Sequence, residues 1–141
     1  MEKKIMYKYN QMELEQFALF EEGCAQEINE VQCQTEVQFG YDKKQLVFCC
    51  KMTHKMTFEG KPLLKSVLNS YFDINQESVD QLTENNIIHF PVNFLVQIAS
   101  LSYGTLRGVI FTKTLGTMVN KLILPPIYLN EMIDKEYDVS L

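Results

Sequence analysis

The sequence predicts an α+β fold, in which a four-stranded antiparallel sheet has a short helix and a long C-terminal helix packed on one of its faces. Three observations lead to this fold class. Apolar and polar residues alternate strictly from Val31 to Phe39 and alternate again from Leu46 to Phe58, the spacing becomes helical after Ile74, and Pro91 directly precedes a long apolar stretch. A length of 141 residues is typical of a single domain, so we expect residues 1–141 to form one.

Three of the strands are predicted from alternation alone. A period of two places one face of a strand on a core and the other in water. Gly40 and the pair Gly60 and Pro62 supply the turns between the alternating stretches, so a meander of three antiparallel strands is expected. The residues expected on the core face are Val31, Cys33, Thr35, Val37 and Phe39, then Leu46, Phe48, Cys50, Met52, His54, Met56 and Phe58, and finally Leu64, Leu68, Phe72 and Ile74.

The first strand is predicted within residues 4–22, where the apolar positions change parity. Ile5, Tyr7 and Tyr9 share one parity, and the apolar residues from Met12 to Phe20 largely share the other. We therefore expect a break near Asn10 and Gln11, and a connecting segment over residues 23–29.

Two helices are expected after the meander. A short one begins at the capping box of Ser78 or already at Asn75, and ends near Asn85 and Asn86. Pro91 is well placed to open a longer helix, whose only charged residue up to position 112 is Arg107. The apolar surface of such a helix is larger than the exposed apolar patch that a small monomer tolerates. This favours a contact between the helix and a second copy or a client, although a helix buried in the core of the monomer fits the same pattern. The residues predicted for an oligomer contact are Phe94, Ile98, Leu101, Thr105 and Gly108.

Composition argues against several classes of function. Asp and Glu outnumber Lys and Arg by 18 to 13, so no basic surface for nucleic acid is expected. Polar residues interrupt the apolar stretches, so neither a signal peptide nor a membrane span is expected, and we predict a cytoplasmic protein. The cysteines lack metal-ligand spacing and are interpreted as reduced strand residues. They are Cys24, Cys33, Cys49 and Cys50.

The motifs of common enzymes are missing, so no catalytic residue, cofactor or metal ligand is predicted. There is no nucleophile elbow, phosphate loop or zinc-protease helix. His54 lies on the core parity of its strand and is interpreted as a buried, hydrogen-bonded residue. His89 has the chemistry of a general base, but no nucleophile motif accompanies it. We therefore expect a protein that is not an enzyme.

The end of the chain is expected to contain an extended segment, one helical turn and a tail. Paired prolines hold residues 120–128 extended, residues 130–133 form the turn, and the acidic residues 134–138 are expected to be solvated and mobile.

The order of these elements resembles that of the SecB family of protein-export chaperones. The resemblance rests on Phe90-Pro91 at the start of the long helix and on Leu-Ile-Leu-Pro-Pro-Ile-Tyr-Leu at 122–129, with the strand order across nearly the whole chain. It departs from the family pattern at Val92-Asn93-Phe94 and in a longer link over residues 107–117. The resemblance implies sheets paired into dimers, helices packed between dimers, and apolar grooves for unfolded clients.

The resulting hypothesis is an ATP-independent holdase that binds unfolded or precursor polypeptides, as a dimer or tetramer. Its client-binding residues are predicted near the first strand: Met12, Leu14, Phe17, Leu19 and Phe20. The family also docks the translocase motor through acidic residues on the open sheet face, where this chain is expected to carry Lys51 and Lys55 with Glu36 and Gln34. The alternative is an interaction module, or an antitoxin-associated chaperone, that serves one partner.

Overall fold

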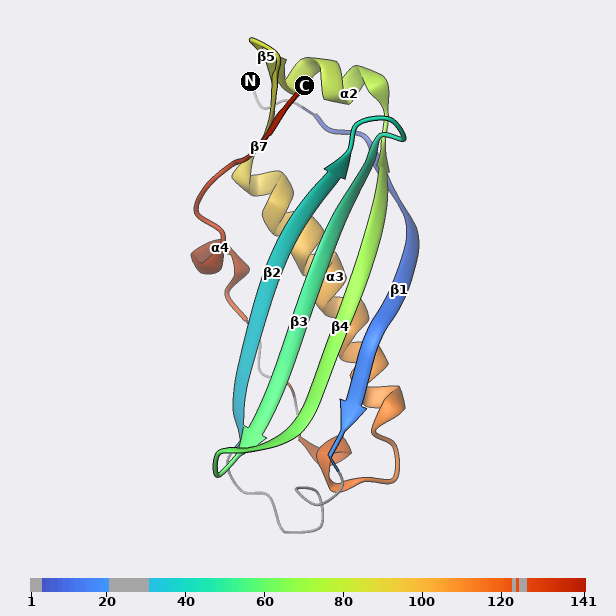
Figure 1. Ribbon diagram of the computed structural model, residues 1–141, viewed down its shortest axis with the longest axis vertical. Coiled ribbons are helices and arrows are strands. Elements are labelled where there is room, and N and C mark those ends of the chain that lie inside the picture. Colours follow the sequence, from blue (N-terminus) through green and yellow to red (C-terminus); the bar gives the residue numbers. More distant parts are fainter. Residues whose placement is uncertain (1–3, 21–30, 123, 125–126) are drawn as a thin grey trace.

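A four-stranded antiparallel sheet forms the body of the protein, as the alternation predicted. The computed structural model describes residues 4–20, 31–122, 124 and 127–141. The strands are β1 (Tyr7–Leu19), β2 (Gln32–Asp42), β3 (Val47–Phe58) and β4 (Lys61–Ile74), in the spatial order β1-β4-β3-β2. Figure 1 shows the long helix crossing behind this sheet, with both chain ends at the same end of the molecule. The connecting segment predicted at 23–29 and the two prolines at 125–126 lie outside the described residues.

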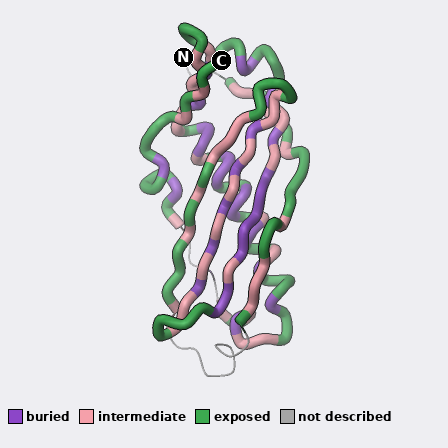
Figure 2. Tube along the Cα trace, in the orientation of Figure 1, coloured by how far each residue is buried: buried purple, intermediate pink, exposed green. Residues whose placement is uncertain are grey.

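The core lies between the sheet and the long helix, on the face that we call the inner face. On β3, Phe48, Cys50, Met52, His54 and Met56 are all buried, and the residues between them are half-buried. Register pairs these positions with Phe72, Ser70, Leu68, Ser66 and Leu64 on β4. The two central strands are therefore buried along their length, while β1 and β2 are more exposed (Figure 2). The core positions predicted on β3 and β4 are confirmed from Phe48 to Met56 and at Leu64, Leu68, Phe72 and Ile74. On β2 the predicted positions are half-buried, and Cys33 is exposed, because β2 is an edge strand of this sheet.

Strand β1 keeps its apolar side chains on the inner face by means of two irregularities. Its register against β4 shifts between Tyr9 and Gln11, and again between Leu14 and Gln16. Each shift inserts one residue into β1 and so reverses the face on which the following side chains lie. The apolar side chains that follow each shift therefore lie on the inner face. The predicted parity break near Asn10 is confirmed, and the second break was not foreseen.

The short helix α2 (Gln76–Leu82) begins after Asn75, whose side chain accepts a hydrogen bond from the Ser78 backbone N–H at 2.9 Å. Of the two predicted starts, the one at Asn75 is therefore correct. The helix is followed by β5 (Thr83–Glu84) and β6 (Ile87–Phe90), an unpredicted hairpin. Its turn places Asn85 and Asn86 at positive φ, the conformation that tight hairpins need and that asparagine tolerates.

The long helix α3 (Val92–Lys113) begins directly after Pro91, as predicted. It extends through residues 107–113, which the sequence analysis had assigned to a link. At its start Phe94 packs against Phe48, Phe90 and Tyr7, with ring centroids 5.3, 5.7 and 5.8 Å apart. This aromatic cluster fixes the orientation of the helix on the sheet.

The C-terminal segment contains a 3-10 turn η1 (Met118–Lys121), the helical turn α4 (Leu129–Met132) and a strand β7 (Tyr137–Ser140). The predicted helical turn is confirmed. The acidic residues of the predicted tail, Asp134, Glu136 and Asp138, are exposed, as expected. The tail is not free along its length, however, because β7 pairs with β6 and completes the three-stranded sheet β5-β6-β7. Tyr137 anchors this strand with its ring 5.9 Å from that of Phe48.

Candidate polypeptide-binding surface

The face of α3 that points away from the sheet carries a row of apolar and small residues. We call this row the α3 seam. It consists of Leu101, Gly104, Gly108 and Phe111, whose spacing by three and four residues places them on one side of α3, and of Leu115 in the turn directly after the helix. Leu101 is 41% exposed, and Phe111 and Leu115 are each 59% exposed. Although α3 has a well-buried side, its outer side therefore remains apolar.

A hollow of about 430 Å³ lies beside the middle of this seam, at Gly104, Gly108 and Phe111, and we call it the α3 groove. Gly104 and Gly108 line it, and a Cβ atom placed on either glycine would meet no atom within 4 Å. The glycines thus leave space into which another backbone fits. The remaining lining is mostly apolar, and it comprises Met56, Arg107, Ile110, Phe111, Thr114, Val119, Asn120, Leu122 and Leu124.

Hydrogen bonds attach one wall of the groove to the end of α3. The Asn120 amide donates to the Phe111 carbonyl oxygen at 2.8 Å and to the Thr114 hydroxyl oxygen at 3.2 Å. The Thr117 hydroxyl donates to the Thr114 carbonyl oxygen at 2.8 Å. These bonds satisfy carbonyls at the C-terminal end of the helix, and they hold η1 in place against it.

Among the described residues that line the groove, Arg107 alone is charged. Its guanidinium carbon lies 6.0 Å from the centre of the Tyr103 ring, within the range of a cation–π interaction. The side chain is exposed, so it offers N–H donors where the groove meets solvent.

The predicted oligomer-contact residues divide into two groups. Phe94 and Ile98 are buried between α3 and the sheet, so they offer no surface to a second copy, and this part of the prediction needs correction. Leu101 and Gly108 are exposed on the α3 seam. Thr105 is half-buried beside β1, where it accepts a hydrogen bond from the Tyr9 hydroxyl at 3.3 Å. Phe111 and Leu115 were not predicted, although the same spacing of three and four residues from Leu101 and Gly108 leads to them.

The predicted client-binding residues form one row along β1. Register places Met12, Leu14, Phe17 and Leu19 opposite Ser70, Leu68, Ser66 and Leu64, all on the inner face, and the Phe20 backbone N–H bonds to Leu63. Met12 is 53% exposed and Phe20 is 41% exposed, whereas Leu14, Phe17 and Leu19 are half-buried against the core. Only the two exposed residues are therefore freely available to a ligand.

Several titratable groups on the strands of the large sheet favour their neutral forms. His54 is fully buried, with Nδ1 2.9 Å from the Thr35 hydroxyl, and burial lowers the pKa of its imidazole to about 4. Burial also raises the pKa of the Cys50 thiol to about 11, against the opposing effect of a hydrogen bond with Ser102. The pKa values of Cys33 and Cys49 are raised by burial as well. The thiolate form of these three cysteines is therefore disfavoured at neutral pH.

The other face of the sheet is polar and carries lysines, as expected for Lys51 and Lys55. Lys55 pairs in register with Gln34, while Lys51 pairs with Gln38 rather than with Glu36. The Lys51 ammonium forms a salt bridge with Glu15, 3.1 Å away. An acidic docking face of the kind that the family resemblance implies is thus interrupted by basic side chains.

Two comparisons with known proteins leave the family of this chain open. No protein-family model matches it, and no curated protein matches it. By length and composition α3 is able to cross a membrane, and 44% of the relevant window is buried within the fold.

Proposed function

We propose that the protein is an ATP-independent holdase that binds unfolded or precursor polypeptides in the α3 groove. The observation that carries this proposal is an apolar surface and an unfilled hollow at the same place. The α3 seam exposes large apolar side chains, and the groove along it has two glycines in its lining. Contiguous exposed apolar surface in a soluble domain typically marks a binding site.

The dimensions and chemistry of the groove suit an extended apolar segment. The two glycines let a client backbone approach α3 closely, and Phe111 and Leu122 supply apolar walls for its side chains. Each CH₂ group that a client buries there contributes about 0.8 kcal/mol. Arg107 at the solvent boundary has N–H groups for client carbonyls. Such contacts select clients by their shape and apolar character rather than by a specific sequence, as a holdase requires.

The resemblance to the SecB family supports the same function. The fold that it implies, an antiparallel sheet with a short and a long helix, is the fold observed. Membership of that family, and assembly into a dimer or tetramer, are parts of this proposal. Light scattering of the purified protein tests the assembly directly.

The holdase activity is tested with a client that aggregates after dilution from guanidinium chloride. The wild-type protein should suppress the increase in light scattering without ATP. Replacing Phe111 and Leu115 together by Asp places two charges on the seam and should abolish the suppression. The double variant should remain folded, because both side chains are already 59% exposed.

Leu141→Asp is the matched control, since Leu141 is also 59% exposed but lies beside the small sheet, where its backbone N–H bonds to Asn86. It should suppress aggregation like the wild type. Met12→Asp with Phe20→Asp tests the exposed part of the β1 row in the same assay. Full suppression by the Phe111 and Leu115 double variant would contradict a binding site in the α3 groove.

A capture experiment separates a general holdase from a module that serves one partner. A holdase should retain many different unfolded proteins from a denatured extract, and the Phe111 and Leu115 double variant should lose them all together. One retained protein from a native extract, with no suppression of aggregation, would favour the single-partner alternative.

A further inference from the structure

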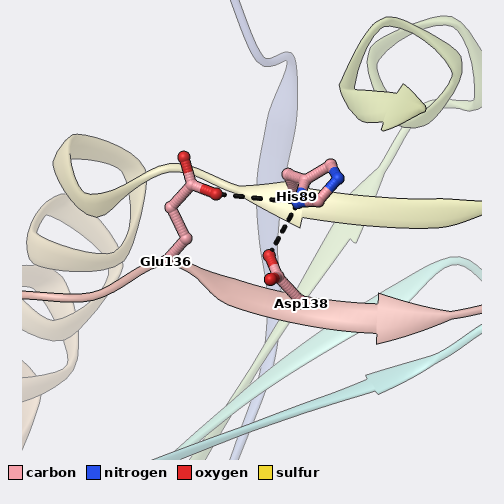
Figure 3. A group of neighbouring side chains, drawn as sticks. All are labelled: His89, Glu136 and Asp138. Atoms are coloured by element: carbon pink, nitrogen blue, oxygen red, sulfur yellow. Dashed lines mark hydrogen bonds and ion pairs between the residues drawn. The ribbon is translucent and has the colours of Figure 1, made fainter. Parts of the chain in front are cut away.

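A histidine and two carboxylates converge on the small sheet, where β6 meets the C-terminal strand. His89 Nδ1 lies 2.9 Å from Asp138 Oδ1 and 3.6 Å from Glu136 Oε2, and one ligand atom from each of the three residues falls within 4.8 Å of the others. Figure 3 shows both carboxylates directed at the same ring nitrogen. The α3 groove does not include any of these residues.

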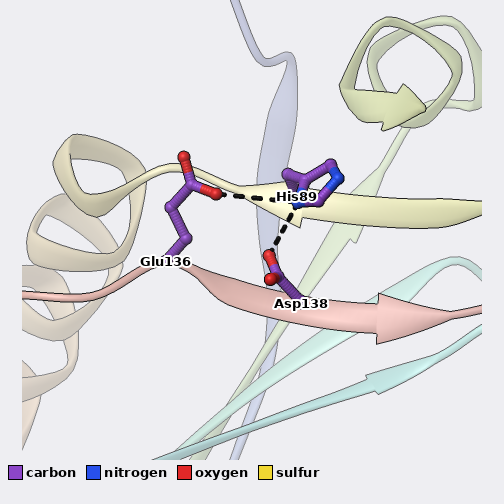
Figure 4. A network of polar contacts seen from close by, with 3 residues as sticks. All are labelled: His89, Glu136 and Asp138. Carbon is purple, nitrogen blue, oxygen red and sulfur yellow. Dashed lines mark hydrogen bonds and ion pairs between the residues drawn. The ribbon is translucent and has the colours of Figure 1, made fainter. Parts of the chain in front are cut away.

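Strand pairing positions these three side chains. His89 and Asp138 are register partners of β6 and β7, and Glu136 precedes Asp138 by two residues, which places both carboxylates on the same side of the strand (Figure 4). Between them, Tyr137 points the other way and packs on Phe48 and Phe90. The ligand atoms are thus held by backbone pairing and by the core, as a preorganised site requires.

The charges of the cluster are incompletely balanced by the protein. A neutral imidazole has at most one proton on Nδ1, so it is able to donate to one of the two carboxylates and not to both. Within the described part of the chain, neither carboxylate forms a salt bridge with a lysine or an arginine. A divalent cation among the three ligand atoms would neutralise both negative charges.

We propose that His89, Glu136 and Asp138 bind a divalent first-row transition-metal ion. One imidazole nitrogen and two carboxylate oxygens are ligands that such ions accept. Metal–ligand bonds of about 2.1 Å in a tetrahedral arrangement require ligand atoms about 3.4 Å apart. The two observed separations from Nδ1, 2.9 and 3.6 Å, lie on either side of that value. Binding replaces any Nδ1 proton by the metal and releases that proton to solvent.

Such an ion would fasten the C-terminal strand. Its three ligands join β6, which leads directly into α3, to a strand whose register partners are all on β6. An ion that binds the folded protein more tightly than the unfolded chain raises the melting temperature as its concentration increases. The exposure of both carboxylates leaves the site accessible to ions from solution.

Titration of the full-length protein with Co²⁺, followed by visible absorption, tests this proposal. We expect one equivalent to bind, with the spectrum of nitrogen and oxygen ligands and without a sulfur-to-metal charge-transfer band. His89→Ala should weaken binding by more than about a hundredfold, because even the loss of an outer-shell partner costs about 10–100-fold. Co²⁺ should raise the melting temperature of the wild type but not that of this variant.

Asp138→Asn provides a second variant of nearly unchanged shape, which should also lose the ion if His89→Ala perturbs folding. Glu131→Gln with Asp134→Asn removes two nearby exposed carboxylates outside the cluster and should bind Co²⁺ like the wild type. Sulfur charge transfer would assign the ion to a cysteine such as the exposed Cys33 and overturn the proposal. Undiminished Co²⁺ binding in both cluster variants would also overturn it. So would a wild type that binds no Co²⁺, because the three residues would then form only an ion pair.

Discussion

The two sides of α3 are both apolar, yet they have opposite roles in the molecule. On the sheet side, Ile98 and Leu106 are fully buried, and Phe94 joins an aromatic cluster with Phe48 and Phe90. On the outer side, Leu101 and Phe111 remain exposed, and Phe111 lines a groove together with two glycines. The sheet side is filled around Ile98 and Leu106, whereas a hollow opens beside the glycines, so apolar composition alone does not distinguish structural residues from a binding surface.

The largest effect is expected from paired truncations on the two sides of the helix. Leu106→Ala should lower the free energy of unfolding by about 2–5 kcal/mol, because it leaves a cavity between α3 and the sheet. Leu101→Ala, at a position that is 41% exposed, should cost less than about 1 kcal/mol. Guanidinium chloride denaturation measures both values. A large cost for Leu101 that depends on protein concentration would indicate that the outer side is covered by a second copy.

A smaller effect, dependent on pH, is expected on the filled side. The pKa of His54 is about 4 in the folded protein, against 6.5 for an ordinary histidine. Between these two pH values the unfolded chain binds more protons than the folded protein. The contribution of His54 to the free energy of unfolding is therefore complete above about pH 6.5 and is lost as the pH falls towards 4. The shift corresponds to about 3 kcal/mol over this window.

His54→Leu should remove this pH dependence, since leucine does not titrate. Urea denaturation between pH 4 and pH 7 measures the slope for both proteins, and the carboxylates contribute equally to each. Equal slopes for the wild type and His54→Leu would show that His54 does not carry the effect.

The filled side was also the part that the sequence predicted best. Alternation identified the inner face of β2, β3 and β4, and Pro91 marked the start of α3, because both signals are local and repeat over many residues. The second bulge in β1 escaped prediction, since Glu15 and Gln16 are both polar and conceal the change of parity. Strand β7 escaped because four residues carry too little pattern, and their conformation depends on pairing with β6.

The candidate site was predicted in part, for a related reason. The helical spacing of apolar residues correctly indicated α3, but Phe94 and Ile98 are buried in the core. A periodic pattern shows which residues share a side of a helix, while the sheet that covers one side is formed by distant parts of the chain. The His89 cluster was missed because its acidic residues lie far away in sequence, within a tail that was expected to be mobile.

The smallest stability change is expected at the two glycines, where it opposes the functional change. Gly104→Ala and Gly108→Ala should each raise the free energy of unfolding by about 0.5–1 kcal/mol, because alanine favours the helix and its methyl group meets no atom within 4 Å. The same methyl groups narrow the α3 groove, so the double variant should melt at a higher temperature but suppress client aggregation less than the wild type. Ser100→Ala, also exposed on α3 but outside the groove lining, is the control and should retain full suppression. Weaker suppression at higher stability would separate the role of the hollow from that of the fold, because loss of fold cannot then explain the loss of function. A double variant that is stabilised and fully active would mean that clients do not approach the helix at the glycines.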